Sequence, residues 1–395
     1  MTFLDIHILQ NVPPSNINRD EDGSPKTARY GGVKRARVSS QSWKRATRTA
    51  FEKDPALPSE DGVRTRLLPQ VIADALAKRE PALKDKADAI AMAAATAMFK
   101  VAAKKPKKNT DSAKDATDPD RPVTEYLLFL GRTQITRVVD ALVSHTGTLA
   151  ATDENDLPSV MDELGLRELA VTGHPGAVAL FGRMVANSPD TGVDAGCQVA
   201  HALSTHEVIS EFDYYTAVDD EQAGDNKGAG MIGSLEFNSA TLYRYATLDL
   251  RTLHTNLDGE QGRTVECALG FVRAFATSMP TGKANTFAHH TRPDLVVLSL
   301  REDRPVSHVS AFERPIRAAG DGYLAASAAA LFTHIADQDD TWGDSPRWNA
   351  AICPAQLTDD PALNKTALPQ RVTWNEALTQ ARSQLTTALN EESRK

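Results

Sequence analysis

The chain has 395 residues, of which 41% are hydrophobic and 24% are charged, and its formal net charge is −8 at pH 7. This composition is typical of a globular protein with one large domain or two to three ordinary ones. No apolar run approaches the roughly 20 residues that span a bilayer, and the N-terminal segment lacks the features of a signal peptide. Three separate cysteines without a CxxC pair indicate a reducing, cytoplasmic location and no structural zinc.

The predicted elements mix strands and helices along the chain. Strands are expected at residues 3–12, 30–38, 124–130, 177–185, 200–215, 234–250 and 295–300. Helices are expected from about Gln41, where Ser39 or Ser40 can act as the N-cap, and at 64–78, 87–99, 135–143, 264–279, 323–335 and 374–390. Helices separate the early strands from the late ones, so we expect an α+β fold with a helical insertion between two halves of one sheet.

Two stretches interrupt this pattern. Residues 100–123 are charged, contain few apolar side chains and include prolines, which predicts a disordered loop. Residues 219–233 are rich in glycine and acidic side chains, which predicts a flexible hairpin tip. Tyr214 and Tyr215 precede this tip, and such side chains can stack on bases or form a small satellite core beneath a loop.

The most distinctive stretch of the sequence is cationic. Residues 23–51 contain no Asp or Glu, and their basic side chains are Lys26, Arg29, Lys34, Arg35, Arg37, Lys44, Arg45 and Arg48. Since the whole chain carries −8, the remainder carries −16. A local cationic segment on an acidic protein attracts polyanions, of which nucleic acid is the commonest, although a solvated charged face is the alternative. Hydroxyl, amide and aromatic side chains in the same stretch favour nucleic-acid contact.

Sequence patterns of enzymes are missing. The chain has no Walker loop and no GxGxxG, GxSxG or HExxH pattern. His201 and His206 are five residues apart in an expected strand, which would place them on opposite faces and makes a shared metal ion unfavourable. The sequence therefore predicts no catalytic residue, no cofactor and no metal ion.

Two pairs of residues leave an alternative open. His289 and His290 could perform acid–base chemistry or contact phosphate, or they could simply face solvent. Asp20 and Asp22 could bind a divalent cation, or they could form a solvated turn.

Several long motifs resemble one known family, CasC, the repeated backbone subunit of type I-E Cascade, which is a CRISPR surveillance complex. The matching segments, in the expected order, are FLDIHIL, NINRD, GGVKRARVSSQSWKRATR, ALFGRM, VAHALSTHEV, DYYTAVDD, LEFNSATLYRY and KANTFAHH. They cover nearly the whole chain except about 100–123 and the extreme C-terminus.

The resemblance implies a fold shaped like a hand. It consists of an RRM-like (ferredoxin-like) palm, an inserted helical finger domain and a projecting β-hairpin thumb. The implied boundaries are 1–54 for the first part of the palm, 55–170 for the fingers, 171–210 for the second part of the palm, 211–236 for the thumb, and 237–395 for the rest of the palm and the C-terminal helices.

The resemblance also implies a function. The chain would be a non-catalytic scaffold that polymerises head-to-tail along CRISPR RNA and presents this guide for pairing with target DNA in antiviral defence. Its partners would be CRISPR RNA, the target DNA strand, further copies of itself and other Cascade subunits. One alternative is an RRM-fold endoribonuclease acting on CRISPR or target RNA through Asp20, Asp22 or the histidine pair. Another is a DNA-binding repressor.

The resemblance assigns site residues as well. RNA backbone contacts are expected from Asn18, Arg19, Lys26, Lys34, Ser39, Gln41, Lys44 and Arg48. Base contacts are expected from Met184, Tyr214, Tyr215, Thr216 and Ile232, with the choice between the two tyrosines left open. The lysine-rich stretch 100–123 is not covered by the resemblance, and its charge makes Lys104, Lys105, Lys107 and Lys108 candidates for contact with DNA phosphates.

Overall fold

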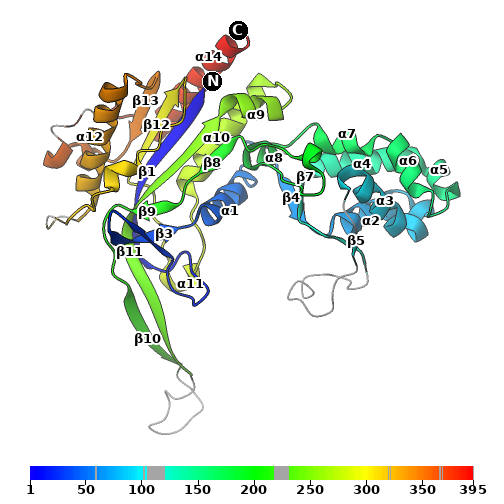
Figure 1. Cartoon of the computed structure of the whole chain (residues 1–395), viewed down its shortest axis with the longest axis horizontal. Helices are drawn as coiled ribbons and strands as arrows, with labels where there is room; N and C mark the ends of the chain where they lie inside the picture. The colour runs from blue at the N-terminus through cyan, green and yellow to red at the C-terminus, as the bar shows by residue number, and fades with distance from the viewer. Residues whose placement is uncertain are drawn as a thin grey trace. The chain divides into compact units, whose positions relative to one another are not determined.

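The structure is a computed structural model that forms two compact units (Figure 1). It describes residues 1–57, 60–100, 103–104, 121–217, 231–318, 320, 322–363, 366 and 368–394, with only the backbone at 103–104, 216–217 and 231–232. The first unit comprises Met1–Ala50, Cys197–Leu250 and Ala268–Lys395, and the second comprises Phe51–Gly196 and Arg251–Cys267. Residues 171–196 therefore belong to the second unit, whereas we had expected them in the palm.

The first unit is built on an antiparallel sheet. Its strand order within the described residues is β13-β12-β1-β11-β9-β3-β2, and β8 and β10 also pair with β11. The strands are β1 (Phe3–Ser15), β2 (Thr27–Tyr30), β3 (Val33–Val38), β8 (Cys197–Val199), β9 (Ala202–Ser204), β10 (Glu211–Ala217), β11 (Met231–Asp249), β12 (Leu295–Arg301) and β13 (Trp348–Ile352). The long partners β1 and β11 lie at the centre of this order, so the sheet is organised around them.

Both faces of strand β1 are buried. Successive side chains of a strand point to opposite faces. On one face, His7 and Leu9 pair with Tyr245 and Tyr243, and this face contributes to a core that includes residues of α12 (Leu324–Trp342). On the other face, the side chain of Arg244 lies between aromatic rings of α1 (Ser40–Phe51) and α10 (Gln261–Thr277). Because both faces of β1 are covered, its polar residues Asp5, His7 and Gln10 are buried together with its apolar ones.

Other helices complete the first unit. They include α11 (Ala284–Phe287), α13 (Ala355–Thr358), α14 (Trp374–Glu392) and the 3-10 helices η4 (Val309–Phe312) and η5 (Pro361–Leu363), whereas all but the first residue of α9 (Leu250–Asn256) belongs to the second unit. A capping box begins α14, in which the Thr373 amide donates to a Glu376 carboxylate oxygen at 2.8 Å and the Glu376 amide donates to the Thr373 hydroxyl at 3.4 Å. The predicted helix 374–390 is thus confirmed.

The second unit is mainly helical. Its helices are α2 (Leu68–Arg79), η1 (Pro81–Lys86), α3 (Ala87–Phe99), α4 (Arg132–Ser144), α5 (Thr146–Ala151), α6 (Leu157–Glu163), α7 (Leu166–Val171), α8 (Gly176–Phe181) and η3 (Pro189–Thr191). Its short strands are β4 (Gly62–Thr65), β5 (Ala103–Lys104), β6 (Val123–Thr124) and β7 (Leu128–Gly131). One apolar core joins α2, α3, α4, α6 and α7. The expected mixed fold and the helical insertion between strands of one sheet are confirmed.

Some predicted elements are wrong in detail. Residues 177–185 form helix α8 and a loop, because a short buried apolar run has no periodicity that separates a strand from a helix. Residues 30–38 are the end of one strand and the whole of another, joined by Gly31 and Gly32 at φ of 58° and 81°. Most of 100–123 and 219–233 lies outside the described residues. No helix in the described part of the chain is long and apolar enough to cross a membrane.

Candidate nucleic-acid interface

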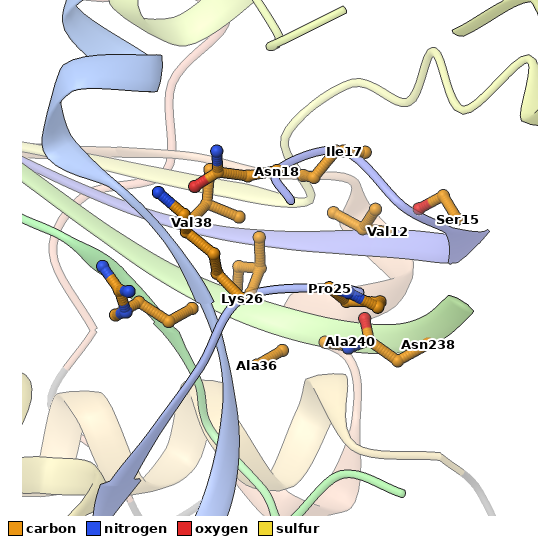
Figure 2. A pocket seen from close by; sticks show the side chains of 12 residues that line it. Val12, Ser15, Ile17, Asn18, Pro25, Lys26, Ala36, Val38, Asn238 and Ala240 are labelled. Carbon is orange, nitrogen blue, oxygen red and sulfur yellow. The ribbon is translucent and has the colours of Figure 1, made fainter. Parts of the chain in front are cut away.

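Two segments of the cationic stretch form one surface together with the loop that precedes them. The Lys26 amide donates to the Asn18 carbonyl at 2.8 Å, and the Arg37 amide donates to the Lys26 carbonyl at 2.9 Å. The side-chain oxygen of Asn18 accepts a hydrogen bond of 2.8 Å from the Ser39 amide at the start of α1. Loop 16–26, strand β3 and helix α1 therefore lie together, and we call them the cationic surface (Figure 2). Its basic side chains are Arg19, Lys26, Lys34, Arg37, Lys44, Arg45 and Arg48.

Helix α1 separates its buried and cationic faces. Trp43, Thr47 and Phe51 recur every four residues and are fully buried. The intervening positions carry Lys44 and Arg48, which are half-buried, and the exposed side chains of Gln41 and Arg45. The packing of α1 against the sheet therefore fixes the direction in which its cations point.

Ser39, for which an RNA backbone contact is also expected, caps the N-terminus of helix α1. It is buried, and its hydroxyl accepts from the Ser42 amide at 3.3 Å. This is the N-cap arrangement expected from the sequence, since the helix begins at Ser40. The hydroxyl of Ser39 is thus directed at the first turn of α1.

Arg35 does not belong to the surface. Its guanidinium is buried and donates to the carbonyl oxygens of Ser204 at 2.8 Å and Phe312 at 2.7 Å. Burial also lowers its pKa. The charge count of the sequence included Arg35, but a count cannot distinguish an exposed cation from one that joins strands together.

Lys34 lies at the edge of the surface, beside an acid. Its ammonium group is 3.4 Å from the Ser210 hydroxyl. Hydrogen bonds from Ser210 and Ser24 hold the pKa of Glu236 below its usual value, and the charge of Lys34 lowers it further. Lys34 is therefore partly neutralised by Glu236.

His201 lies beside the cationic surface, which the sequence did not indicate. It is exposed, and its Nδ1 accepts a hydrogen bond of 3.1 Å from the Ser40 amide. Desolvation lowers the pKa of His201, and the charges of Arg37 and Lys26 lower it further. Because Nδ1 is the acceptor, the proton of the neutral ring is on Nε2, which remains a donor.

A pocket between loop 16–26 and the sheet is too small for a nucleotide base. Its volume is about 20 Å³, which is room for about one water molecule. Figure 2 shows Asn18, Lys26 and Val38 around it, together with Asn238 and Ala240 of β11. The cationic surface therefore offers groups that lie along its outside and no enclosed cavity at this position.

The β10–β11 hairpin separates its aromatic side chains onto two faces. Directly paired residues share a face of a hairpin, and Tyr214 pairs with Ser234 while Tyr215 pairs with Gly233. A Cβ on Gly233 would lie 2.6 Å from the Tyr215 ring, so this ring covers the Gly233 backbone. Tyr214 shares the opposite face with Phe212, and their exposed fractions are 66% and 71%.

The structure does not bring all the predicted site residues together. Met184 is 89% exposed but belongs to the second unit. Thr216 pairs with Ile232 through the backbone, and their side chains are not described. Lys104 is described only in its backbone, and Lys105, Lys107 and Lys108 lie outside the described residues.

The residues weighed for catalysis have structural partners. One carboxylate oxygen of Asp20 accepts from the amides of Asp22 at 3.1 Å and Ser24 at 2.9 Å, as in a capped turn. His289 is buried, and its Nε2 lies 3.0 Å from the Pro280 carbonyl. No group of three or more His, Cys, Asp or Glu residues within the described ranges could hold a metal ion.

His206 is separated from His201 by its packing. It is buried, and its ring stacks on Tyr323 at a centroid distance of 3.7 Å. Its Nε2 accepts from the Thr241 amide at 3.1 Å. These contacts assign His206 to the core of the first unit.

Comparison with known proteins shows the family. The family model described as "CT1975-like protein" matches residues 4–380. The chain belongs to the CT1975-like protein family. None of the curated proteins matches the chain.

Two solved structures are similar to this chain over nearly its full length. A chain of a "CRISPR RNA-guided surveillance complex, pre-nicking" is similar with a TM-score of 0.81 and 32% identity, over 97% of this chain and 100% of that one. A chain of another "CRISPR RNA-guided surveillance complex" is similar with a TM-score of 0.70 and 30% identity, over 98% of this chain and 99% of that one.

Proposed function

We propose that this CT1975-like protein is a CRISPR RNA-binding backbone subunit of a Cascade surveillance complex of type I-E. The observation that carries the proposal is the cationic surface, in which α1, β3 and loop 16–26 present basic side chains in one continuous region of an acidic protein. Similarity to chains of CRISPR RNA-guided surveillance complexes over the full length supports this reading of the surface.

The chemistry of the surface suits an RNA backbone. Arg19, Lys26, Lys44 and Arg48 supply cations for phosphates, which provide affinity without sequence selection. The amides of Gln41 and Asn18 and the His201 Nε2–H can bond phosphate or 2′-hydroxyl oxygens. No base pocket is needed because sequence is then selected by pairing between guide and target.

The hairpin has a different role in this proposal. Phe212 and Tyr214 form an exposed aromatic pair on one of its faces. Aromatic side chains can stack on a displaced base of any identity. The hairpin would cross the guide and displace a base, while Tyr215 supports the hairpin through Gly233. Met184 remains a candidate for base contact from the second unit, and an RRM-like palm remains the proposed class for the sheet.

Assembly is proposed to be repetitive. One copy would bind the next head-to-tail along the guide, because heterologous contacts of this kind generate open helical filaments. The guide segments left between hairpins would pair with the target DNA strand. Electron microscopy of particles purified with their RNA would test this arrangement, and a compact monomer without RNA would contradict it.

We also propose that the subunit does not cleave RNA. The Asp20 carboxylate oxygen holds a turn, and the Nε2 of His289 faces a carbonyl oxygen of its own loop. Incubation of the purified protein with RNA, with and without magnesium, is the direct test. Cleavage that Asp20→Ala or Asp22→Ala abolishes would favour the endoribonuclease instead.

The RNA surface itself is tested by the salt dependence of binding. For a single strand, each lost phosphate contact reduces the slope of log K against log salt by about 0.7. The double variant Lys26→Ala/Lys44→Ala should therefore flatten this slope by about 1.4 for a polyuridine RNA. Arg304→Ala is the control, because this cation is 58% exposed in the same unit but lies after β12. Equal slopes for the double variant and the wild type would overturn the proposal.

A further inference from the structure

The loop 280–292 is a second acid-free segment of the first unit. Between Glu266 and Asp294 the sequence contains no Asp or Glu. Within the loop, His290 and Arg292 are exposed and Lys283 is half-buried. On a chain with 52 acidic residues, this segment has the same charge character as the cationic surface.

The loop lies directly against the segment that carries Asn18 and Arg19. A Cβ on Gly282 would lie 2.4 Å from the carbonyl oxygen of Ile17 and 3.1 Å from that of Asn16, so the two backbones are in contact there. Figure 1 shows the loop's short helix α11 beside the dark blue loop that follows β1. Lys283 follows this contact by one residue, and Arg19 follows it by two residues on the other segment.

The same loop reaches the root of the hairpin. The ring of Phe287 in α11 lies 5.9 Å from the ring of Phe237 in β11, measured between centroids. The loop therefore contacts both the segment proposed to hold phosphates and the strand that carries the hairpin.

The loop is held in a strained conformation. Lys283 and Ala288 flank α11 in the left-handed region, at φ of 52° and 45°. Such a conformation costs a residue with a side chain about 1–2 kcal/mol and persists only where surrounding contacts impose it. The contacts here include the His289 Nε2 with the Pro280 carbonyl at 3.0 Å, and the Thr291 hydroxyl, which donates to the Asn11 carbonyl at 2.8 Å. The backbone is thus fixed at Lys283, where Gly or Asn would be less strained.

We propose that loop 280–292 is an RNA-contacting element in which Lys283 binds a phosphate between Arg19 and the root of the hairpin. This inference rests on the proposed function, since the ligand is the same RNA. The strained backbone positions the lysine ammonium, and Arg292 and His290 add donors on the exposed side of the loop.

Three substitutions at Lys283 separate charge from strain. Lys283→Ala removes the charge and keeps a side chain in the strained conformation, whereas Lys283→Gly removes both the charge and the strain. Lys283→Arg keeps the charge. We expect the Ala and Gly variants to flatten the salt slope for polyuridine RNA by about 0.7, and the Arg variant to retain it. We expect the Gly variant to be at least as stable as the wild type to urea.

The outcomes distinguish this inference from the function on which it rests. If Lys44→Ala flattens the slope and Lys283→Gly leaves it unchanged, loop 280–292 does not bind RNA and the proposed function stands. If neither variant changes the slope, the proposed function itself fails. A Lys283→Gly variant that keeps its stability and has the reduced salt slope supports the inference, because a purely structural role of Lys283 would not produce that combination.

Discussion

The guanidinium of Arg244 lies 3.7 Å from the ring centroid of Trp43, and both side chains are fully buried. The ring of Phe275 lies 4.6 Å away, and one guanidinium nitrogen donates to the Gln10 side-chain oxygen at 2.6 Å. Burial lowers the pKa of Arg244 to about 9, which leaves it charged at neutral pH. Through its contact with Trp43, Arg244 of β11 helps to hold in place the helix whose neighbouring face carries Lys44.

Trp43→Ala should destabilise the first unit by about 3–5 kcal/mol, because it opens a cavity and removes the aromatic cover of a buried charge. Urea unfolding followed by circular dichroism would measure this loss. Arg45→Ala on the exposed face of the same helix should change stability by no more than about 0.5 kcal/mol. Equal effects for both variants would mean that α1 is not seated through Trp43.

The hairpin variants should separate RNA binding from folding. Tyr214→Ala should weaken RNA binding by about 1–3 kcal/mol, since an exposed ring stacks on a base, and should leave stability nearly unchanged. Tyr215→Ala should reduce stability instead, because its ring covers Gly233. Binding titrations and thermal unfolding of both variants provide the measurement. The reverse pattern would place the stacking face of the hairpin on the Tyr215 side.

RNA binding should strengthen as the pH falls from 7.5 to 6. The pKa of His201 is lowered by desolvation, followed by the charges of Arg37 and Lys26. RNA phosphates would offset those charges and raise this pKa, so that binding takes up a proton, with a limit of about tenfold in affinity per pH unit. The His201→Gln variant should lose this dependence. Persistence of the full dependence in His201→Gln would assign it to another group.

Acid should destabilise the first unit through its buried histidines. Burial lowers the pKa of His308 to about 3, with further contributions from the charges of Arg301 and His334, and it also holds the pKa of His7 well below 6.5. Between pH 6.5 and 3 the unfolded chain binds protons at His308 that the folded chain does not, so stability falls as the pH falls. The expected slope is about 1.4 kcal/mol per pH unit for each histidine.

One neighbouring group acts in the opposite direction. Burial raises the pKa of Asp5, so above pH 3.8 the folded chain retains a proton that the unfolded chain has lost, which makes the net loss in acid smaller. Urea unfolding at a series of pH values tests the histidine effect. His308→Gln should reduce the slope, whereas the exposed His290→Gln should not. A slope that His308→Gln leaves intact would contradict this account.

The sequence predicted those elements that have a clear period or an obvious boundary. The alanine-rich helix 87–99 was predicted with its observed bounds, because its apolar face repeats at helical spacing. The turn between β2 and β3 at Gly31 was missed. A residue with a side chain does not fit there, because a Cβ would lie only 1.7 Å from the Glu313 carbonyl oxygen. That requirement comes from a segment almost three hundred residues away, which no local pattern contains.

In the candidate site, too, local sequence patterns predicted some features, whereas others depend on contacts between distant residues. Charge composition indicated the cationic surface, but it could not distinguish Arg35, which bonds buried carbonyl oxygens, from Lys26 at the surface. The sequence left open which of the two tyrosines would contact a base, and only the pairing with Gly233 shows that the Tyr215 ring covers a backbone segment whereas Tyr214 lies on the other face. Placement of His201 beside Ser40 depends on a contact across 161 residues of chain.

Strand β11 continues without interruption from the hairpin to the centre of the sheet, from Met231 to Asp249. At about 3.3 Å per residue, this strand is roughly 60 Å long. Its inner half is clamped by β1 along eleven paired positions from Phe3 to Ser15. A force applied to Tyr214 is therefore transmitted through backbone hydrogen bonds to the central strand pair of the first unit. Bending is therefore expected in the outer half of β11, where β10 is its sole strand partner among the described residues.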